Sequence, residues 1–173
     1  FMYHFQPIVN AKTGDIFAYE ALMRTDKSIG MNPLEVLAAA KEYNRLYDIE
    51  KATMFNIMER YSIERPKFED KMVFINTIPG HFLNEGDIAI FREKYGKYTN
   101  NCMFEITEQE SVSDEELDII RKLCGSNNIA IDDYGSGHSN IVNLMRYAPQ
   151  VIKIDRFLVT DIHKDQNKQM FVR

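Results

Sequence analysis

The segment Met103-Phe-Glu-Ile-Thr107 is a strand-like apolar run that carries one carboxylate, Glu105. Burying an unpaired carboxylate in apolar surroundings is costly. Four further segments on either side of this one share the pattern: Phe17–Arg24 with Glu20, Met72–Thr77 with Asn76, Ile129–Tyr134 with Asp132 and Asp133, and Val151–Asp155 with Lys153. Because each is followed by helix-like sequence, we expect the polar side chains to meet in one place.

The alternation of strand-like and helix-like sequence predicts the fold class. Strands are predicted at Met72–Thr77, Cys102–Thr107, Ile129–Tyr134 and Val151–Phe157, and they lead into helices at Ile88–Tyr95, Asp114–Leu123, Ser139–Arg146 and Leu158–Met170. Ser113 and Glu116 have the spacing of an N-terminal cap for the second of these helices. Such alternation is typical of an α/β protein with a largely parallel sheet.

The N-terminal sequence predicts a hairpin and two helices. The predicted elements are strands at Tyr3–Val9 and Ile16–Arg24, a turn at Lys12–Asp15, a helix from Pro33 to Asn44 and a helix from about Asp48 to Tyr61. Asn32 and Glu35 supply a capping box for the first helix, with proline at its first position. Pro66 is expected to end the second helical region.

Strand parity indicates that the polar residues share one face of the sheet. Successive side chains on a strand point to opposite faces, so Glu105 lies opposite Phe104 and Ile106. The same parity holds for Glu20, Asn76, Asp132 and Lys153 in the other four segments. Each polar residue is at or near the C-terminal end of its strand, where barrels and open α/β sheets keep their active sites.

Composition excludes several classes of protein. With 173 residues, 45% hydrophobic and 27% charged, the chain fits one globular domain. Its net charge of −5 argues against a nucleic-acid polymer as partner, because phosphate binding needs a basic surface. Cys102 and Cys124 are not spaced as a metal or redox motif, so we expect two reduced thiols in the core.

The chain shows no targeting or membrane signal. It contains no apolar run of the roughly 20 residues that span a bilayer and no signal peptide, so we expect a cytoplasmic domain without direct membrane contact. It starts at Phe1 and stops at Arg173 in helix-like sequence. We therefore expect it to be cut from a longer polypeptide, fused to other signalling domains and anchored, in some arrangements, to a membrane elsewhere.

Six short motifs occur in a specific order over nearly the whole chain. They are Gln6-Pro-Ile8, Glu20-Ala-Leu22, Phe74-Ile-Asn76, Phe104-Glu-Ile-Thr-Glu108, Asp132-Asp-Tyr-Gly-Ser-Gly-His-Ser139 and Lys153-Ile-Asp155. Each motif alone is weak, but in this order and approximate spacing they resemble the EAL domain, the cyclic-di-GMP phosphodiesterase family.

The resemblance implies a TIM-like (β/α)8 barrel whose first strand is antiparallel to its neighbour. A complete barrel of this kind needs about 250 residues. By resemblance, residues 1–173 supply all of it except the last two βα units, which carry a further glutamate and a glutamine-containing loop in the family. We therefore expect a C-terminally incomplete EAL-type domain.

The resemblance also implies a site for Mg²⁺ or Mn²⁺, which phosphodiester hydrolysis uses to supply a nucleophile and to neutralise phosphate oxygens. Glu20, Asn76, Glu105 and Asp132 would bind one ion. Asp132 and Asp133 would bind a second ion about 3.5–4 Å away. The substrate would be cyclic-di-GMP, and the expected product is the linear dinucleotide pGpG.

The same resemblance assigns roles to further residues. Lys153 would orient or deprotonate the attacking water, with a proton affinity lowered by the metals, and would be catalytic together with Glu20 and Asp133. Gln6 and Leu22 would line the ligand groove. The remaining assignments are Arg24 as a forked phosphate ligand and Glu108 as the residue that holds the mobile loop Tyr134–Ser139.

Structural alternatives remain open for several of these residues. Lys153 and Asp155 could be a structural ion pair. Asp132 and Asp133 could belong to an ordinary turn. Arg24 could be a surface charge.

Departures from the family pattern leave open what the domain does. Thr25 stands where the family usually has tryptophan, and Tyr134, Ser136, His138 and Asn140 replace the usual loop residues. The rival functions are therefore a weakly active or inactive cyclic-di-GMP receptor and a structural dimerisation module. Family members often pair through helices near strands five and six, which predicts a homodimer through Ser139–Tyr147.

Overall fold

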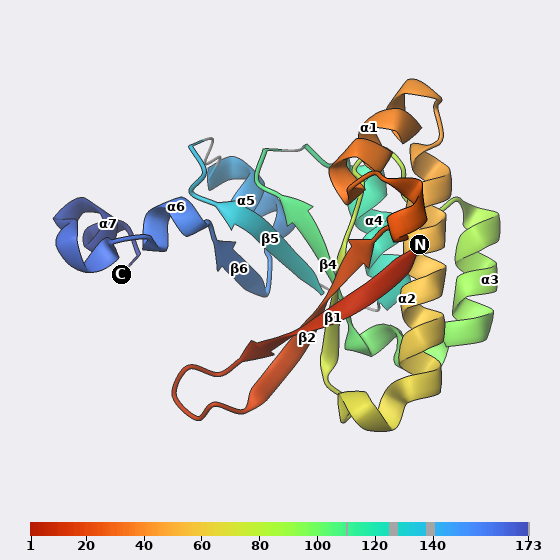
Figure 1. Cartoon of the computed structure of the whole chain (residues 1–173), viewed down its shortest axis with the longest axis horizontal. Coiled ribbons are helices and arrows are strands. Elements are labelled where there is room, and N and C mark those ends of the chain that lie inside the picture. Colours follow the sequence, from red (N-terminus) through yellow and green to blue (C-terminus); the bar gives the residue numbers. More distant parts are fainter. Residues whose placement is uncertain (110, 125–127, 138–140, 173) are drawn as a thin grey trace.

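One six-stranded sheet organises the computed structural model, which describes residues 1–109, 111–124, 128–137 and 141–172. The strands are β1 (Met2–Val9), β2 (Ile16–Arg24), β3 (Met72–Asn76), β4 (Cys102–Thr107), β5 (Ile129–Tyr134) and β6 (Val151–Ile154). They lie side by side in chain order (Figure 1). β1 is antiparallel to β2 and all other pairs are parallel, which confirms the predicted hairpin and sheet.

Among the described residues, the first five helices lie in the connections between successive strands, and the last two follow β6. The helices are α1 (Pro33–Glu42), α2 (Leu46–Phe68), α3 (Glu85–Tyr95), α4 (Asp114–Cys124), α5 (Ile141–Tyr147), α6 (Arg156–Val159) and α7 (Gln166–Phe171). α2, α3 and α4 lie along one side of the sheet (Figure 1). The predicted capping box is present at α1: Glu35 N donates to Asn32 Oδ1 at 3.1 Å, and Asn32 N donates to Glu35 Oε2 at 2.7 Å.

The two faces of the sheet bury different groups, as strand parity predicts. The helix-covered face is apolar, and its fully buried residues include Val73, Ile75, Phe104, Ile106 and Ile131. The opposite face of the sheet, called the inner face below, has a smaller apolar cluster of Ala18, Phe74, Met103 and Ala130. Toward the C-terminal ends of the strands, the inner face continues with the polar residues of the five segments.

Helix α2 is longer than the sequence predicts. It starts at Leu46 and continues past Pro66 to Phe68, with a kink at Glu64, where φ is −99° and ψ is 16°. The kink accommodates a proline, which cannot donate the helical hydrogen bond. The extra turn brings Phe68 against Phe5, Tyr19 and Tyr61 at ring-centroid distances of 4.7, 5.2 and 5.3 Å. This aromatic packing makes the added turn favourable.

The predicted helix at Leu158–Met170 is wrong. Strand β6 stops at Ile154, and the chain then forms α6, a short 3₁₀ turn at Ile162–Lys164, and α7. Asp161 has φ of 56°, a left-handed conformation that interrupts a helix. Asp165 then accepts hydrogen bonds from the N–H groups of Asn167 and Lys168 and so starts α7 afresh.

Two further expectations concern the core and the membrane. Cys102 and Cys124 are free and buried, which confirms the expected reduced core thiols. Among the described residues, none of the helices combines the length and apolar character needed to cross a lipid bilayer.

Candidate metal centre

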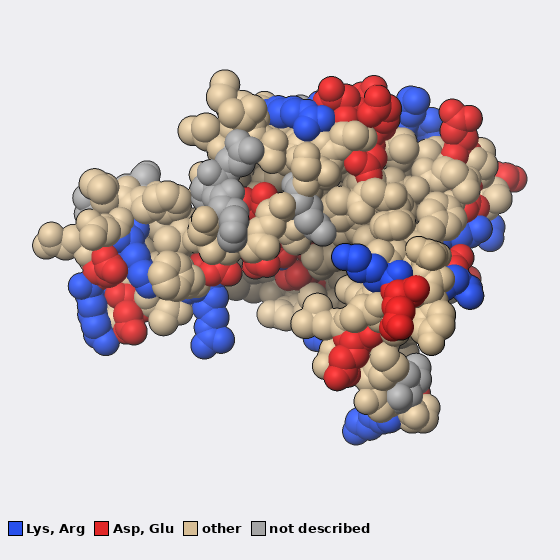
Figure 2. Space-filling model, turned by 90° about the horizontal axis from the view of Figure 1, so that it is seen from above, with Lys and Arg blue, Asp and Glu red and all other residues tan. Residues whose placement is uncertain are grey.

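Side chains from four strands converge at the C-terminal end of the sheet. Lys153 Nζ on β6 lies 2.5 Å from Glu105 Oε1, 3.1 Å from Asp132 Oδ1 and 3.2 Å from Glu20 Oε1. The carboxylates of Glu20, Glu105 and Asp132 come from β2, β4 and β5, and one oxygen of each lies within 4.8 Å of the others. Figure 2 views the molecule from this end and shows acidic side chains among neutral ones. The predicted convergence of these residues is therefore present.

Glu105 is the buried centre of this cluster. Its side chain has 0% exposure. Burial raises the pKa of Glu105 to about 8, while the Lys153 ammonium acts in the opposite direction. Its Oε2 is buried and has no hydrogen-bond donor among the described residues. A carboxylate oxygen of this kind can coordinate a hard cation. The carboxylate oxygens of the cluster are therefore ligands that fit Mg²⁺ or Mn²⁺.

Asn76 lies beside the carboxylates. It ends β3 in register with Glu105, and its Nδ2 is 3.5 Å from Glu20 Oε1. Its amide can therefore supply a neutral oxygen at the same place. Burial opposes the charge of Lys153, but the three carboxylates outweigh this effect and raise the pKa of Lys153. The lowered proton affinity expected for Lys153 depends on bound cations and stays a prediction.

Asp133 follows Asp132 at an irregularity in β5. The pairing of β5 with β6 shifts between Ile131 and Tyr134, and Asp133 has φ of 53°. One extra residue on β5 relative to β6 is typical of a β-bulge, which re-aims the side chains of a strand. Burial raises the pKa of Asp133, and the charges of Asp132 and Asp155 act in the same direction. Asp133 is not among the three carboxylates that share the 4.8 Å cluster, so its metal contact stays a prediction.

Glu108 contacts the loop after β5. Its Oε2 accepts a hydrogen bond from Gly135 N at 2.8 Å, and its own N–H donates to Asp132 O at 3.0 Å. Gly135 has φ of 92°, and a Cβ there would lie 2.0 Å from Leu158 Cδ1, so only glycine fits. The loop residues His138, Ser139 and Asn140 lie outside the described residues.

The predicted substrate-binding residues flank the cluster. Gln6 pairs with Glu20 in the hairpin, so the two share a face, and Gln6 is exposed. Leu22 is half-buried on that face of β2. Arg24 is half-buried and donates from Nη1 to Met23 O at 2.8 Å. Their contacts with a ligand stay predictions.

The alternative of a structural pair between Lys153 and Asp155 has no support in the described residues. Lys153 contacts the three carboxylates, whereas Asp155 accepts a hydrogen bond from Phe157 N at 2.6 Å and caps α6. The simple-turn alternative does not account for Asp132, which is part of the cluster, but it fits Asp133, whose carbonyl oxygen accepts a hydrogen bond from Ser136 N at 3.2 Å.

Sequence reasoning missed two carboxylates that hold the loop following β3. Glu50 on α2 accepts a hydrogen bond from Ile78 N at 3.0 Å, and Glu116 on α4 accepts one from Gly80 N at 2.5 Å. Glu50 gave a usable signal, because it is a charged residue between apolar positions of a helical pattern. Glu116 did not, because its place in a capping box already accounted for it.

A family model described as EAL domain matches residues 1–173. The blue light- and temperature-regulated antirepressor BluF of Escherichia coli (strain K12) is 27% identical over 179 residues, covering 98% of this chain and 42% of BluF. The probable cyclic di-GMP phosphodiesterase PdeD of the same strain is 26% identical over 165 residues, covering 92% of this chain and 31% of PdeD. The chain therefore spans less than half the length of these two relatives.

Solved structures have the same fold. A standalone versatile EAL protein from Vibrio cholerae O395, in its c-di-GMP-bound form, has a TM-score of 0.72 and 26% identity, covering 98% of this chain and 72% of that one. Klebsiella pneumoniae BlrP1, in a manganese/cy-diGMP complex, has a TM-score of 0.75 and 27% identity, covering 98% of this chain and 44% of that one. The likeness confirms the predicted TIM-like fold.

Proposed function

The chain belongs to the EAL domain family, and from this membership we propose that it hydrolyses cyclic-di-GMP to linear pGpG in a metal-dependent reaction. The observation that carries the proposal is the convergence of Glu20, Glu105 and Asp132 around Lys153 at one end of the sheet. A manganese complex with the dinucleotide in the BlrP1 structure supports this choice of substrate and metal.

The proposed metal ligands are the three carboxylates and Asn76. Glu105 contributes a buried oxygen that lacks a donor among the described residues, which favours a cation there. A second ion would use Asp132 and Asp133. When bound, Mg²⁺ or Mn²⁺ would neutralise phosphate oxygens and favour ionisation of the nucleophile.

Lys153 is proposed to hold or pass the proton that moves during hydrolysis. In the reaction, a water oxygen joins phosphorus, the bond from phosphorus to one ribose 3′ oxygen breaks, and that oxygen leaves with a proton. Lys153 Nζ lies within reach of three carboxylates, so it can hold or pass a proton at this point. Its positive charge also offsets the carboxylates around it.

Substrate positioning would fall to the hairpin and β2. Gln6, exposed on the face of Glu20, and Leu22 would line the groove, and Arg24 would bind a phosphate. Glu108 would keep the loop after β5 in place through its bond to Gly135.

A cyclic-di-GMP receptor with little turnover is the second candidate. Thr25, which stands where tryptophan is usual in the family, donates its hydroxyl to Met31 O at 2.5 Å and is thereby tied to the connection before α1. A guanine would find no aromatic ring at this residue. The relative BluF carries the name of an antirepressor, which supports a regulatory use of the domain.

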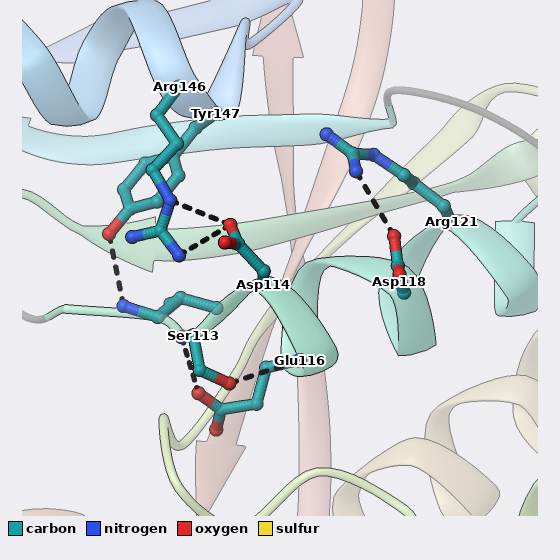
Figure 3. A network of polar contacts seen from close by, with 8 residues as sticks. Ser113, Asp114, Glu116, Asp118, Arg121, Arg146 and Tyr147 are labelled. Carbon is teal, nitrogen blue, oxygen red and sulfur yellow. Dashed lines mark hydrogen bonds and ion pairs between the residues drawn. The ribbon is translucent and has the colours of Figure 1, made fainter.

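The domain is proposed to work inside a larger signalling protein and as a homodimer. The chain spans only 42% of BluF and 31% of PdeD, which supports a place within a larger protein. Figure 3 shows the attachment of α5 to α4: Arg146 donates to Asp114 Oδ1 at 2.9 and 2.7 Å, and the Tyr147 hydroxyl accepts from Val112 N at 3.0 Å. This attachment leaves apolar side chains of α5 exposed, namely Ile141, Val142 and Met145, and these exposed side chains support the proposed homodimer.

The direct test is turnover of cyclic-di-GMP with Mg²⁺ or Mn²⁺, with pGpG measured by chromatography. We expect pGpG from wild type and a loss of at least 100-fold in Glu20→Ala, because removal of a ligand removes the ion. Glu93→Gln on the exposed face of α3 is the control and is expected to keep full activity. Binding without turnover in wild type favours the receptor, and undiminished turnover in Glu20→Ala refutes the proposed site.

A further inference from the structure

Glu50 is a buried carboxyl outside the candidate metal centre. It lies on α2 with 1% exposure, and its Oε2 accepts a hydrogen bond from the backbone N–H of Ile78 at 3.0 Å. Its Oε1 is buried without a hydrogen-bond partner among the described residues. A buried polar atom in this state costs free energy of folding, so an apolar side chain would suit the core better.

The loop that Glu50 contacts begins directly after β3 and is held from two other sides. Thr77 donates from its N–H and its hydroxyl to the carbonyl oxygen of Glu105, at 3.2 and 2.7 Å. Gly80 N donates to Glu116 Oε1. The other oxygen of Glu116 accepts from Ser113 N at 2.8 Å, as Figure 3 shows. Three elements, α2, β4 and α4, therefore fix the backbone that leaves Asn76.

We infer that Glu50 is a positioning residue for Asn76, acting through the backbone of Thr77 and Ile78 to keep the amide oxygen of Asn76 directed at the metal. The inference rests on the proposed function. Groups that orient metal ligands typically change metal affinity by about 10–100-fold when they are removed. Asn76 is exposed at the end of its strand, so its orientation depends on the backbone that follows it.

The chemistry of Glu50 suits this task. Burial raises the pKa of Glu50 to about 8, so near neutral pH the carboxyl carries a proton in most molecules. A protonated carboxyl still accepts the hydrogen bond from Ile78 N. It therefore holds the loop without adding a buried negative charge.

The test compares Glu50→Met with Glu50→Gln in the purified protein. Methionine fills the space but accepts no comparable hydrogen bond, whereas glutamine keeps an acceptor oxygen for Ile78 N. For Glu50→Met we expect about tenfold weaker Mn²⁺ binding by calorimetry and about tenfold faster amide hydrogen exchange in residues 77–83, with the melting temperature unchanged or raised. For Glu50→Gln we expect both quantities within about twofold of wild type.

Matched variants separate positioning from loss of fold. Glu59→Met is on the exposed side of the same helix and is expected to match wild type in both measurements. If Glu50→Met does not fold, Glu50→Asp takes its place, because the shorter side chain keeps the carboxyl but loses reach. Metal affinity that falls only together with the melting temperature assigns Glu50 a merely structural role and overturns the inference.

Failure of the inference and failure of the proposed function give different results. Hydrogen exchange needs neither metal nor substrate, so unchanged exchange in Glu50→Met overturns the inference whatever wild type catalyses. Wild type that binds Mn²⁺ but forms no pGpG refutes the proposed function, and the comparison of Glu50 variants by Mn²⁺ binding still decides the inference.

Discussion

The two faces of the sheet differ in what they bury, although they are made from the same strands. On β4, Phe104 points into the apolar layer under the helices, and its neighbour Glu105 points to the other face with both carboxylate oxygens buried. The helix-covered face is apolar along its length. The inner face is apolar only at one end, around Met103 and Phe74, and is charged at the other.

This contrast separates stability from function within single strands. Each fully buried apolar side chain stabilises the fold by roughly 1.5–3 kcal/mol. A buried cluster of one ammonium and three carboxylates gives weaker support, since the cost of removing charges from water offsets their attraction. The inner face therefore tolerates charges that the larger apolar layer of the other face can compensate.

The largest expected effect is a loss of stability after a substitution on the apolar face. Phe104→Ala is expected to lower the free energy of unfolding by about 3–5 kcal/mol, whereas Met103→Ala lowers it by about 2–3 kcal/mol because the inner cluster is smaller. Urea unfolding measures both. An equal or greater loss in Met103→Ala would contradict the division of roles between the faces.

The next effect is a loss of stability after a substitution at the charged end of the inner face. Lys153→Met leaves three carboxylates without their ammonium, and we expect a loss of about 2–3 kcal/mol in the presence of a chelator. Mn²⁺ is expected to restore part of it, because a ligand that binds the native state stabilises it. Lys164→Met removes an exposed pair with Asp161 and is the control, with a change below about 0.5 kcal/mol. A loss that Mn²⁺ leaves unchanged would argue against a cation site.

A third effect is the contribution of Glu50 to the pH dependence of stability. Its pKa is about 8 in the folded chain against an ordinary value of 4.5, so the native state binds the proton more tightly than the unfolded state. The stability from this proton is complete below pH 4.5 and is lost as pH rises through about 8, by up to about 1.4 kcal/mol per unit. Glu50→Gln is expected to remove the share of that slope that Glu50 contributes in unfolding experiments between pH 5 and 8, while the share of Glu105, whose pKa burial also raises to about 8, remains. An unchanged slope would mean that Glu50 ionises normally.

The smallest expected effect is a change in cyclic-di-GMP affinity after a substitution at residue 25. Thr25→Trp supplies an aromatic surface and is expected to tighten cyclic-di-GMP binding by about 1 kcal/mol, or roughly fivefold. Thr13→Trp, in the hairpin turn at the other end of β2, is the matched control in the same calorimetric titration. Equal affinities for the two variants would show that residue 25 does not face the ligand.

Much of the fold follows from the sequence because alternation within strands is a local property. The parity of Glu105 against Phe104 predicts the two faces, and the positions of Glu20, Asp132 and Lys153 in their strands predict the cluster. Packing between distant segments is not local, so the sequence does not predict it as well. The turn that brings Phe68 onto the hairpin is one example.

The same limit applies to the loop after β3 and to the C-terminal region. The hydrogen bond from Ile78 to Glu50 joins residues 28 positions apart, and no local pattern specifies it. After β6, apolar residues occur at helical spacing, but Asp161 and Asp165 favour turns and caps over a continuous helix. Their local preference decides the outcome there.

The irregular pairing of β5 has a geometric consequence. On a regular strand, side chains of one face are spaced by about 6.6 Å along the chain, and consecutive residues diverge. Asp132 and Asp133 are consecutive, so an unbroken strand would direct one of them among the covering helices. Ile131 and Tyr134 pair with Ile152 and Ile154, so β5 carries one extra residue over this stretch, and the strict alternation of its side chains is interrupted at Asp132 and Asp133.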